Sequence, residues 1–246
     1  MSIIKNIFYN MSRSRGRLAS VARHAYMGMA AVVAACGVES CANDGYDTGD
    51  GNYSYLSAEL AVVHTNSSAA AVSATLDDDT DLQFSSPVKL GSGLKCDTIY
   101  RALLYYDKID TSLPVNPRGI TIVPVASVVR QAEVKEMVTD PLGIESVWKS
   151  KNGSYLNVSL LLKSGTTAAD SRQSVGFVEE KLVEESDGTK RAVIRVYHDQ
   201  SDVPQYYTVQ QYVSIDARKL DADIVELHAN TYDGEVVKCV DMRTLQ

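Results

Sequence analysis

The chain has 246 residues, with 24 Lys and Arg against 31 Asp and Glu, and 45% of its residues are hydrophobic. This length supports one large or two small domains with hydrophobic cores. Residues 1–35 hold five basic and no acidic residues, so residues 36–246 hold 19 basic against 31 acidic, a net charge of −12. That part contains no cluster of Lys and Arg, which argues against nucleic acid as a partner.

The N-terminal segment resembles a bacterial lipoprotein signal peptide. Five basic residues, the last of them Arg23, precede the short apolar run Ala25–Cys36, and no acidic residue occurs before Glu39. Such a run is too short to cross a bilayer, which needs about 20 apolar residues, so a retained transmembrane anchor is the weaker alternative. We therefore expect residues 1–35 to be a signal peptide.

The resemblance implies that Val33–Ala35 is the recognition box of the processing peptidase and that Cys36 receives the lipid. Cys41 is the competing lipidation site, although Glu39 lies two positions before it and fits such a box poorly. Met11 is an alternative start that would give a signal of about 25 residues. Gly37, in place of a retaining aspartate, favours a lipoprotein of the outer membrane; the side on which the protein faces stays open.

Residues 36–54 are predicted to be a flexible tether. The stretch Asn43–Asn52 is rich in Gly, Asp and Asn, which cannot bury enough apolar surface to fold. Calcium binding by its acidic side chains is the alternative, but the spacing lacks the complete calcium loop with its distal Glu.

The remaining residues predict an all-β chain, because Val, Ile, Thr and Tyr alternate with polar residues and Gly, Asp, Asn and Pro punctuate them. Residues 55–131 are predicted to form a small barrel with four candidate strands: Ser57–His64, Leu82–Phe84, Ile99–Tyr106 and Ile120–Val129. Asp77–Asp81 is expected to be a hairpin tip whose like charges face water, with calcium binding as the alternative.

Residues 132–246 are predicted to form an antiparallel β-sandwich, because a sheet with one apolar face must cover it with a second sheet. In the segment Tyr155–Lys163, we expect Leu156, Val158, Leu160 and Leu162 to face a core and Asn157, Ser159 and Lys163 to face water. Asp187–Gly188 and Asp233–Gly234 predict hairpin turns, and Asp199–Pro204 a longer connection. The other candidate strands are Ser174–Glu184, Lys190–His198, Tyr206–Ile215, Ile224–Asn230 and Val236–Val240.

The cysteines leave two alternatives open. With Cys36 lipidated, three remain, and a Cys96–Cys239 bridge is permitted in an oxidising envelope. Burial of both as small apolar residues in strands is the favoured interpretation. No C-x-x-C motif supports a zinc site or thiol redox chemistry.

At five places the chain resembles the NigD-like family of bacterial envelope lipoproteins, over nearly all of residues 36–246. These places are Asp44–Asp50, Tyr100–Tyr106, Asp140–Ile144 with Ser146–Trp148, Gly153–Val158, and Asn230–Glu235. The resemblance implies an OB-like barrel followed by a β-sandwich. It implies a role in bacteriocin immunity or envelope protection and brings no catalytic residues with it.

The sequence offers no motif for catalysis, a metal or a cofactor, so we expect a protein that is not an enzyme and holds none of these. His64, His198 and His228 belong to no metal or hydrolase motif; a metal site from His198, His228 and Asp199 or Glu226 is the weaker alternative. Adjacent glutamates such as Glu184 and Glu185 point to opposite faces of a strand and are interpreted as solvated edge charges.

Tyrosines are the best binding signal. We predict Tyr206, Tyr212 and Tyr232 as ligand-binding residues, although aromatic side chains in strands more often pack in the core. Period two places Tyr206 and Tyr212 on one strand face and Tyr207 on the other; Trp148 is expected at the core or its boundary. The predicted function is a lipid-anchored envelope protein that acts by protein or peptide interaction or by bacteriocin-immunity-type protection. A glycan-binding accessory lipoprotein that uses exposed tyrosines is the alternative.

Overall fold

The structure is a computed structural model, and it describes residues 56–91, 93–107, 114–166 and 172–243. The predicted signal peptide, the tether and both Cys36 and Cys41 lie outside these residues. The described part is built of fourteen strands and two short 3-10 turns, η2 (Gln131–Glu133) and η3 (Ala217–Lys219), which confirms the all-β fold class. Within these residues, no helix has the length and apolar character that crossing a membrane requires.

The first five strands form one curled, half-barrel sheet with the strand order β3-β2-β1-β4-β5. The ends of this sheet approach each other where Phe84 of β3 forms a parallel bridge with Val115, just before β5. Two backbone hydrogen bonds hold that bridge, from the Ser85 amide to the Val115 carbonyl and from the Val115 amide to the Gln83 carbonyl. The strands are β1 (Leu56–Thr65), β2 (Ala70–Leu76), β3 (Asp81–Lys89), β4 (Ile99–Asp107) and β5 (Pro117–Ile122).

Small side chains fill the inside of this sheet, because a tightly curled sheet leaves little room there. The buried cluster contains Ala61, Ala71, Ala74 and Ala102 together with larger residues such as Leu104. Strand β2 was not predicted, since its alanine- and serine-rich sequence has weak strand propensity. Its alanines are buried against β1 and β3, so tertiary packing decides its conformation.

The predicted strand Ile120–Val129 is wrong as a single element. Strand β5 ends at Ile122, and the chain then forms two short strands, β6 (Val125–Ala126) and β7 (Val128–Arg130). Both pair in parallel with strands of the sandwich, β6 with β12 and β7 with β10. The run is rich in β-branched residues, but Pro124 interrupts it between β5 and β6, where the chain changes sheet.

The remaining strands form two sheets that pack face to face as a sandwich. One has five strands in the order β14-β13-β11-β10-β7, and the other has four in the order β6-β12-β9-β8. The strands are β8 (Gly143–Lys149), β9 (Tyr155–Ser164), β10 (Ser174–Glu184), β11 (Lys190–Asp199), β12 (Tyr207–Asp216), β13 (Ile224–Thr231) and β14 (Gly234–Asp241).

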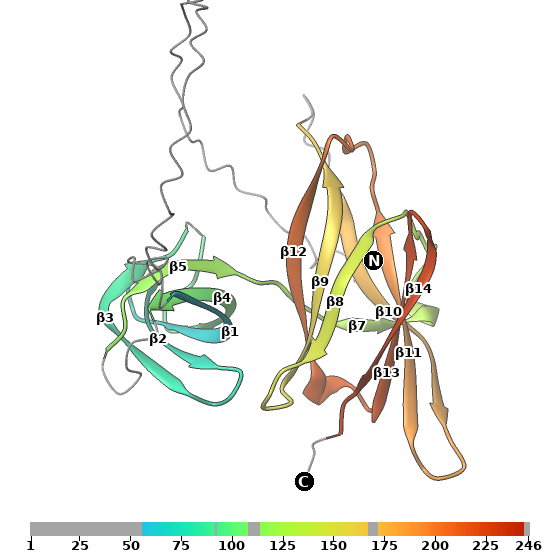
Figure 1. Cartoon of the computed structure of the whole chain (residues 1–246), viewed down its shortest axis with the longest axis horizontal. Helices are drawn as coiled ribbons and strands as arrows, with labels where there is room; N and C mark the ends of the chain where they lie inside the picture. The colour runs from blue at the N-terminus through green and yellow to red at the C-terminus, as the bar shows by residue number, and fades with distance from the viewer. Residues whose placement is uncertain (1–55, 92, 108–113, 167–171, 244–246) are drawn as a thin grey trace, which may run out of the picture. The chain divides into compact units, whose positions relative to one another are not determined.

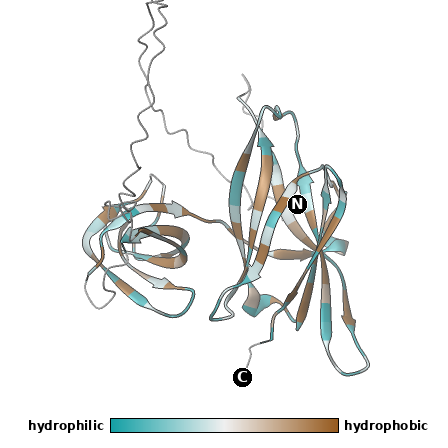
Figure 2. Cartoon of the chain, in the orientation of Figure 1, coloured by the Kyte–Doolittle hydropathy of each residue, from teal (hydrophilic) through white to brown (hydrophobic). Residues whose placement is uncertain are grey.

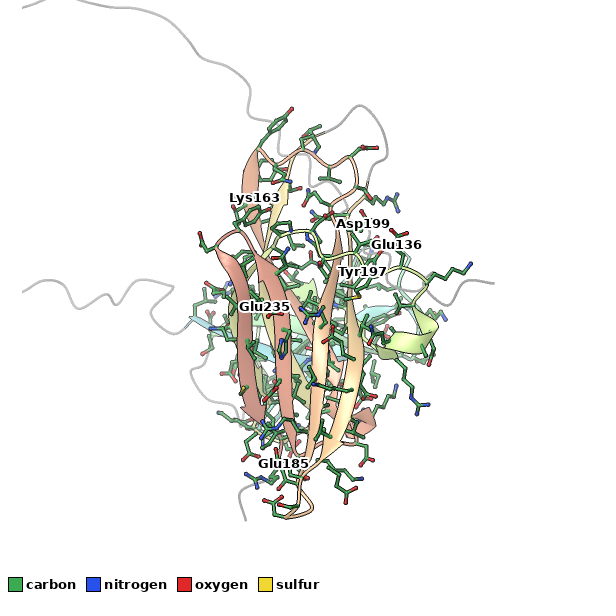
Figure 3. All side chains as sticks on the ribbon, turned by 90° about the vertical axis from the view of Figure 1, so that its right-hand side faces the viewer. Glu136, Lys163, Glu185, Tyr197, Asp199 and Glu235 are labelled. Atoms are coloured by element: carbon green, nitrogen blue, oxygen red, sulfur yellow. The ribbon has the colours of Figure 1, made fainter. Side chains whose placement is uncertain are left out.

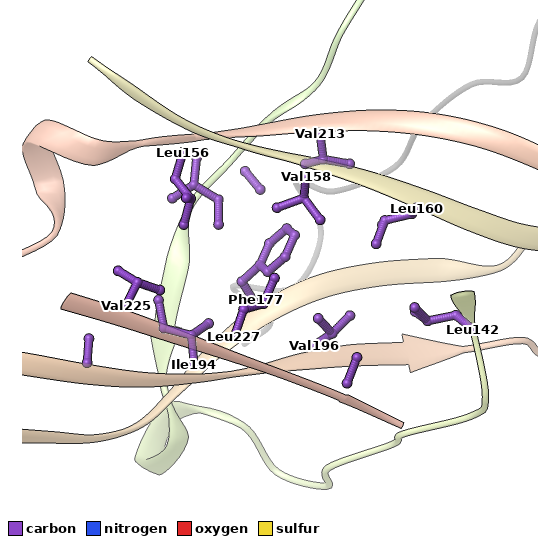
Figure 4. Packing of buried hydrophobic residues seen from close by; sticks show 14 of the residues in the cluster. Leu142, Leu156, Val158, Leu160, Phe177, Ile194, Val196, Val213, Val225 and Leu227 are labelled. Atoms are coloured by element: carbon purple, nitrogen blue, oxygen red, sulfur yellow. The ribbon is translucent and has the colours of Figure 1, made fainter. Parts of the chain in front are cut away.

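The core of the sandwich lies between these sheets, with Phe177 of β10 between side chains of both (Figure 4). Hydrophobic and hydrophilic residues alternate along many strands, as expected for sheets that bury one face (Figure 2). The prediction for β9 is confirmed on its inner face, where its four alternate aliphatic residues are at most 3% exposed: Leu156, Val158, Leu160 and Leu162.

The prediction for the outer face of β9 is wrong, because Asn157 and Ser159 are buried rather than solvated. The Ser159 hydroxyl donates a 2.7 Å hydrogen bond to Glu145 in the neighbouring strand β8. Strand β8 was itself not predicted; its register shifts between Ile144 and Ser146, and this irregularity breaks the period-two pattern.

Asn157 is buried because it belongs to a polar cluster around Arg101 of β4, whose side chain is completely buried. The Arg101 guanidinium forms a two-pronged ion pair with Asp77, with N–O distances of 2.5 and 2.7 Å. It also donates to Asn157 and Ser214 at 3.1 Å and lies over the Tyr155 ring at 4.2 Å. Asp77 is therefore directed to Arg101 rather than to water, contrary to the prediction for the hairpin tip, whereas Asp78 and Asp79 are exposed as predicted.

Candidate functional site

Three solvent-exposed tyrosines at one end of the sandwich form the candidate binding site. Tyr206 is 78% exposed, Tyr207 49% and Tyr232 48%. We call these three residues the tyrosine rim. They come from the start of β12 and from the β13–β14 turn, so the rim draws on both sheets of the sandwich.

The backbone at the end of β9 holds Tyr206 and Tyr207. The Tyr206 amide donates to the Ser164 carbonyl at 2.9 Å, and Tyr207 is the register partner of Ser164. Gly165 follows, and a Cβ at this position would lie 2.8 Å from the Pro204 Cβ and 2.9 Å from the Tyr206 ring. The glycine therefore leaves the space in which the Tyr206 ring lies.

Tyr232 lies in the β13–β14 turn, where Gly234 has a φ of +112° that favours glycine. Its hydroxyl donates to the Gln205 side chain at 3.3 Å, and the Lys163 ammonium lies 5.8 Å from the centre of its ring. Figure 3 shows Lys163 near this end of the sandwich. Partial burial, and next the negative charge of Asp140, raise the pKa of Tyr232, so its hydroxyl stays a hydrogen-bond donor near neutral pH.

The structure does not bring Tyr212 to the rim. Tyr207 pairs with Ser164 and Tyr212 with Ser159, so the two tyrosines are five residues, or about 17 Å, apart along β12. Tyr212 instead packs edge to face against Trp148, with ring centres 6.2 Å apart, and its hydroxyl accepts a hydrogen bond from Gln210 at 3.0 Å. Tyr206 precedes β12, so the predicted strand begins one residue later than expected, and the alternation that placed Tyr206 on the face of Tyr212 does not extend to it.

The rim offers flat rings, phenol hydroxyls, one amide and one ammonium group. Such a set can stack on or pack against a ligand and form directed hydrogen bonds at its edges. Lys163 and Gln205 were not predicted as site residues. Only the pairing of β9 with β12 and the approach of the β13–β14 turn bring them to the tyrosines, and no local motif marks either one.

The histidines do not converge. His198 is buried, with its ring nitrogens 2.9 Å from the Asp140 carbonyl and 3.1 Å from the Gln173 side chain. His228 lies beside Glu226 and Glu235. In the described segments, no three His, Cys, Asp or Glu side chains are grouped as metal ligands would be. His198 and His228 thus have separate surroundings.

Both described cysteines differ from the favoured prediction. Cys96 and Cys239 are free thiols and both are exposed, so they are neither bridged nor buried. Cys239 lies on β14, an edge strand with one face toward solvent. The period-two pattern of that strand did not reveal which of its faces is covered.

The fold is similar to that of solved structures from Bacteroides species. A NigD-like immunity protein from Bacteroides caccae matches with a TM-score of 0.57 and 19% identity, over 74% of this chain and 90% of that one. A protein of unknown function from Bacteroides vulgatus matches with a TM-score of 0.57 and 16% identity, over 76% and 90%. A candidate lipoprotein from Bacteroides fragilis matches with a TM-score of 0.54 and 9% identity, over 77% and 100%.

These matches confirm, at the level of the fold, the resemblance to NigD-like proteins. The chain therefore shares its all-β fold, a curled sheet followed by a sandwich, with a structure of a NigD-like immunity protein. No protein-family model matches the sequence, and no curated protein matches it either.

Proposed function

We propose that this chain is a NigD-like lipoprotein of the bacterial cell envelope that binds a protein or peptide and is not an enzyme. The lipid would be attached to Cys36, which lies outside the described residues, and the outer membrane is the proposed location. Two similar structures support this proposal, one an immunity protein and the other a candidate lipoprotein. The basic and apolar pattern of residues 1–35 supports it independently.

The tyrosine rim is the observation that carries the binding function. Tyrosine is enriched at protein interfaces because its ring contributes apolar area and its hydroxyl contributes a hydrogen bond. Tyr206 leaves 78% of its surface in solvent, and Tyr207 and Tyr232 leave about half of theirs. Three exposed tyrosines at one end of the sandwich, with Lys163 and Gln205 in contact with Tyr232, suit a partner surface better than a packing role.

Site-specific photo-crosslinking in cells tests this proposal. A photoreactive phenylalanine analogue at position 206 of the full chain is expected to form a discrete adduct with a second protein. The same probe at Ile99, an exposed β4 residue of the half-barrel sheet (59% exposed), serves as the matched control. The adduct at position 206 should decrease several-fold when Tyr232 is changed to Ala.

Two results would contradict the proposal: no adduct from position 206, or an adduct that forms equally from Ile99 and is indifferent to Tyr232→Ala. Gly165→Ala provides a second variant that substitutes no tyrosine. Its Cβ would lie 2.8 Å from the Pro204 Cβ and 2.9 Å from both the Pro204 carbonyl oxygen and the Tyr206 ring, so it should shift the segment that carries position 206 and reduce the adduct as well.

A glycan is the second candidate ligand, and the contacts of Tyr232 favour it. A ring flanked by an ammonium at 5.8 Å and an amide at 3.3 Å combines the stacking surface and the hydrogen-bonding groups that sugars require. A glycan array probed with the purified chain distinguishes the two candidates. Binding that Tyr232→Ala abolishes would support the glycan, and an empty array together with a protein adduct would exclude it.

We also propose that an OB-like barrel and a sandwich are the two domains, predicted from the sequence as residues 55–131 and 132–246. Because β6 and β7 pair with strands of the sandwich, we place the boundary earlier, at residues 123–124 between β5 and β6. The strand order β3-β2-β1-β4-β5 and the parallel bridge between Phe84 and Val115 support an OB-like closure of the first sheet. Limited proteolysis that cuts near residues 123–124 and leaves two resistant fragments would support this boundary, and a preferred cut near residue 131 would contradict it.

A further inference from the structure

One edge of the five-stranded sheet is only partly covered. Strand β7 pairs with Phe177–Glu179 of β10 and with no later residue of that strand. Past the register shift between Glu179 and Lys181, residues Lys181–Glu184 pair with β11 on one side only. This segment, which we call the open edge, lies in the β10–β11 hairpin, whose ribbon is drawn in orange in Figure 1.

The hydrogen bonds of the hairpin determine which backbone groups of the open edge are unpaired. The Glu185 amide donates to the Thr189 carbonyl, so the backbone of Glu185 points toward β11. Lys190 is the register partner of Glu184, but its amide donates to the Asp223 carboxylate and its carbonyl accepts from the Asp223 amide. The backbone groups of Lys190 therefore point away from Glu184. Since backbone polar groups alternate along an antiparallel strand, those of Glu184 and Leu182 point away from β11.

The side chains of the open edge are exposed on both faces. Leu182 is 43% exposed and Val183 38%, and both flanking residues, Lys181 and Glu184, are exposed as well. Unpaired backbone groups next to exposed aliphatic side chains form a template on which another strand can pair. Among the described residues, Lys181 makes no ion pair, whereas Glu185 is already bound to Arg191 at 2.7 Å.

The charges of this segment are self-complementary in one register. When two copies of the open edge pair antiparallel around Val183, Leu182 of each lies opposite Glu184 of the other, and their outward backbone groups meet. In this register, Lys181 of each copy lies opposite Glu185 of the other, on the same face as Val183. Pairing around Leu182 would instead oppose Glu180 with Glu184, and pairing around Glu184 would oppose that residue with itself; like charges disfavour both.

We propose that two copies of this chain dimerise through the open edge of β10, with Val183 at the two-fold axis. The strand that pairs with the open edge belongs to a second copy of this chain, because in the register around Val183 the edge is complementary to itself in backbone hydrogen bonds, in aliphatic contact and in charge. Such a two-fold contact is closed and uses the edge once per copy, so it yields a dimer and no fibre. The open edge lies at the Glu185 end of the sandwich, whereas Lys163, which contacts Tyr232, lies near the other end (Figure 3). The dimer therefore leaves the tyrosine rim free.

Charge reversal tests this proposal. Lys181→Glu places Glu opposite Glu185 twice in the dimer, and Glu185→Lys places Lys opposite Lys181 twice. Each variant alone should therefore weaken the dimer about tenfold or more. An equimolar mixture should restore it, because the heterodimer has an opposite-charge pair at both positions. The measurement is sedimentation velocity of the full chain, purified from membranes in detergent, over a range of concentrations.

Lys135→Glu, an equal charge change at an exposed residue before β8, is the matched control and should leave the dimer unchanged. Circular dichroism identifies any variant that fails to fold, and restoration in the mixture excludes misfolding as the cause of a loss. A monomer for the unaltered chain at all concentrations would overturn the proposal, as would a mixture no more dimeric than its parts. The Tyr206→Ala/Tyr232→Ala variant should still dimerise, which separates this result from the proposed function.

Discussion

Arg101 is a charged side chain without solvent exposure, and its environment compensates for the loss of hydration. Asp77 supplies the opposite charge, Asn157 and Ser214 accept two further hydrogen bonds, and the Tyr155 ring lies against the guanidinium. A buried charge that loses its partner is strongly destabilising, even where the intact pair adds little net stability. Asp77 and Arg101 should therefore tolerate no single neutral substitution.

Asp77→Asn is expected to lower the free energy of unfolding by about 3–5 kcal/mol, because it leaves the Arg101 charge buried and uncompensated. Asp78→Asn is the matched control in the next position. The Asp78 ion pair involves Lys151, which is 77% exposed, so its loss should cost about 1 kcal/mol or less. Urea unfolding measures both variants, and equal midpoints for the two would show that the buried pair has no special role.

Single residues also show the limits of prediction from sequence. Tyr206 and Tyr232 were predicted as site residues from their type, because tyrosine rings can stack on a ligand. Lys163 and Gln205 were not, because each is near Tyr232 only through folding that joins distant segments. The ion pair of Asp77 with Arg101 could not be predicted for the same reason. Nothing in an aspartate-rich turn indicates that one of its carboxylates pairs with a buried arginine.

Turns and strands were easier to predict where local chemistry determines them. Asp187–Gly188 and Asp233–Gly234 were predicted as hairpin turns, and both dipeptides lie where consecutive strands reverse. Gly188 has a φ of +83° and Gly234 a φ of +112°, conformations that residues with a Cβ adopt only with strain. The strand Ser174–Glu184 was predicted with the bounds that the structure gives β10.

Gly188→Ala should lower the free energy of unfolding by about 1–2 kcal/mol, the cost of a left-handed backbone for a residue with a Cβ. The added methyl group would meet no atom within 4 Å, so steric contact contributes nothing. Gly91→Ala is the control, since its site is equally open without a positive φ, and it should be neutral or stabilising by about 0.5 kcal/mol. Thermal unfolding checks the pair; a loss shared by both variants would mean that the backbone of Gly188 is not the cause.

Elements were missed where the sequence departs from regular alternation. Strand β2 consists mostly of small residues that suit a tightly curled sheet, and β8 contains a register shift between Ile144 and Ser146. The run from Ile120 to Val129 is rich in β-branched residues but is interrupted at Pro124, and it leaves one sheet and joins two others. Local propensity predicts that a segment is extended; it does not predict which neighbour the segment pairs with.

The architecture as a whole was predicted more securely than any of its functional residues. Alternating hydrophobicity and Gly-rich turns indicate an all-β chain, and the resemblance to NigD-like proteins implied the order of a curled sheet and a sandwich. Similar structures with TM-scores of 0.54 to 0.57 confirm that fold. The choice of binding partner depends on surface side chains, which differ widely between proteins that are 9% to 19% identical. The shared fold therefore does not identify the partner.

The account depends most on the lipid anchor, because an envelope protein that meets its partner at a membrane must first be held there. Mass spectrometry of the N-terminal peptide of the chain, isolated from the membrane fraction of the bacterium that encodes it, tests this directly. We expect a peptide that begins at Cys36 and carries the mass of acyl chains on that residue. An unmodified peptide that spans Val33–Cys36, from a chain recovered in the soluble fraction, would contradict the account.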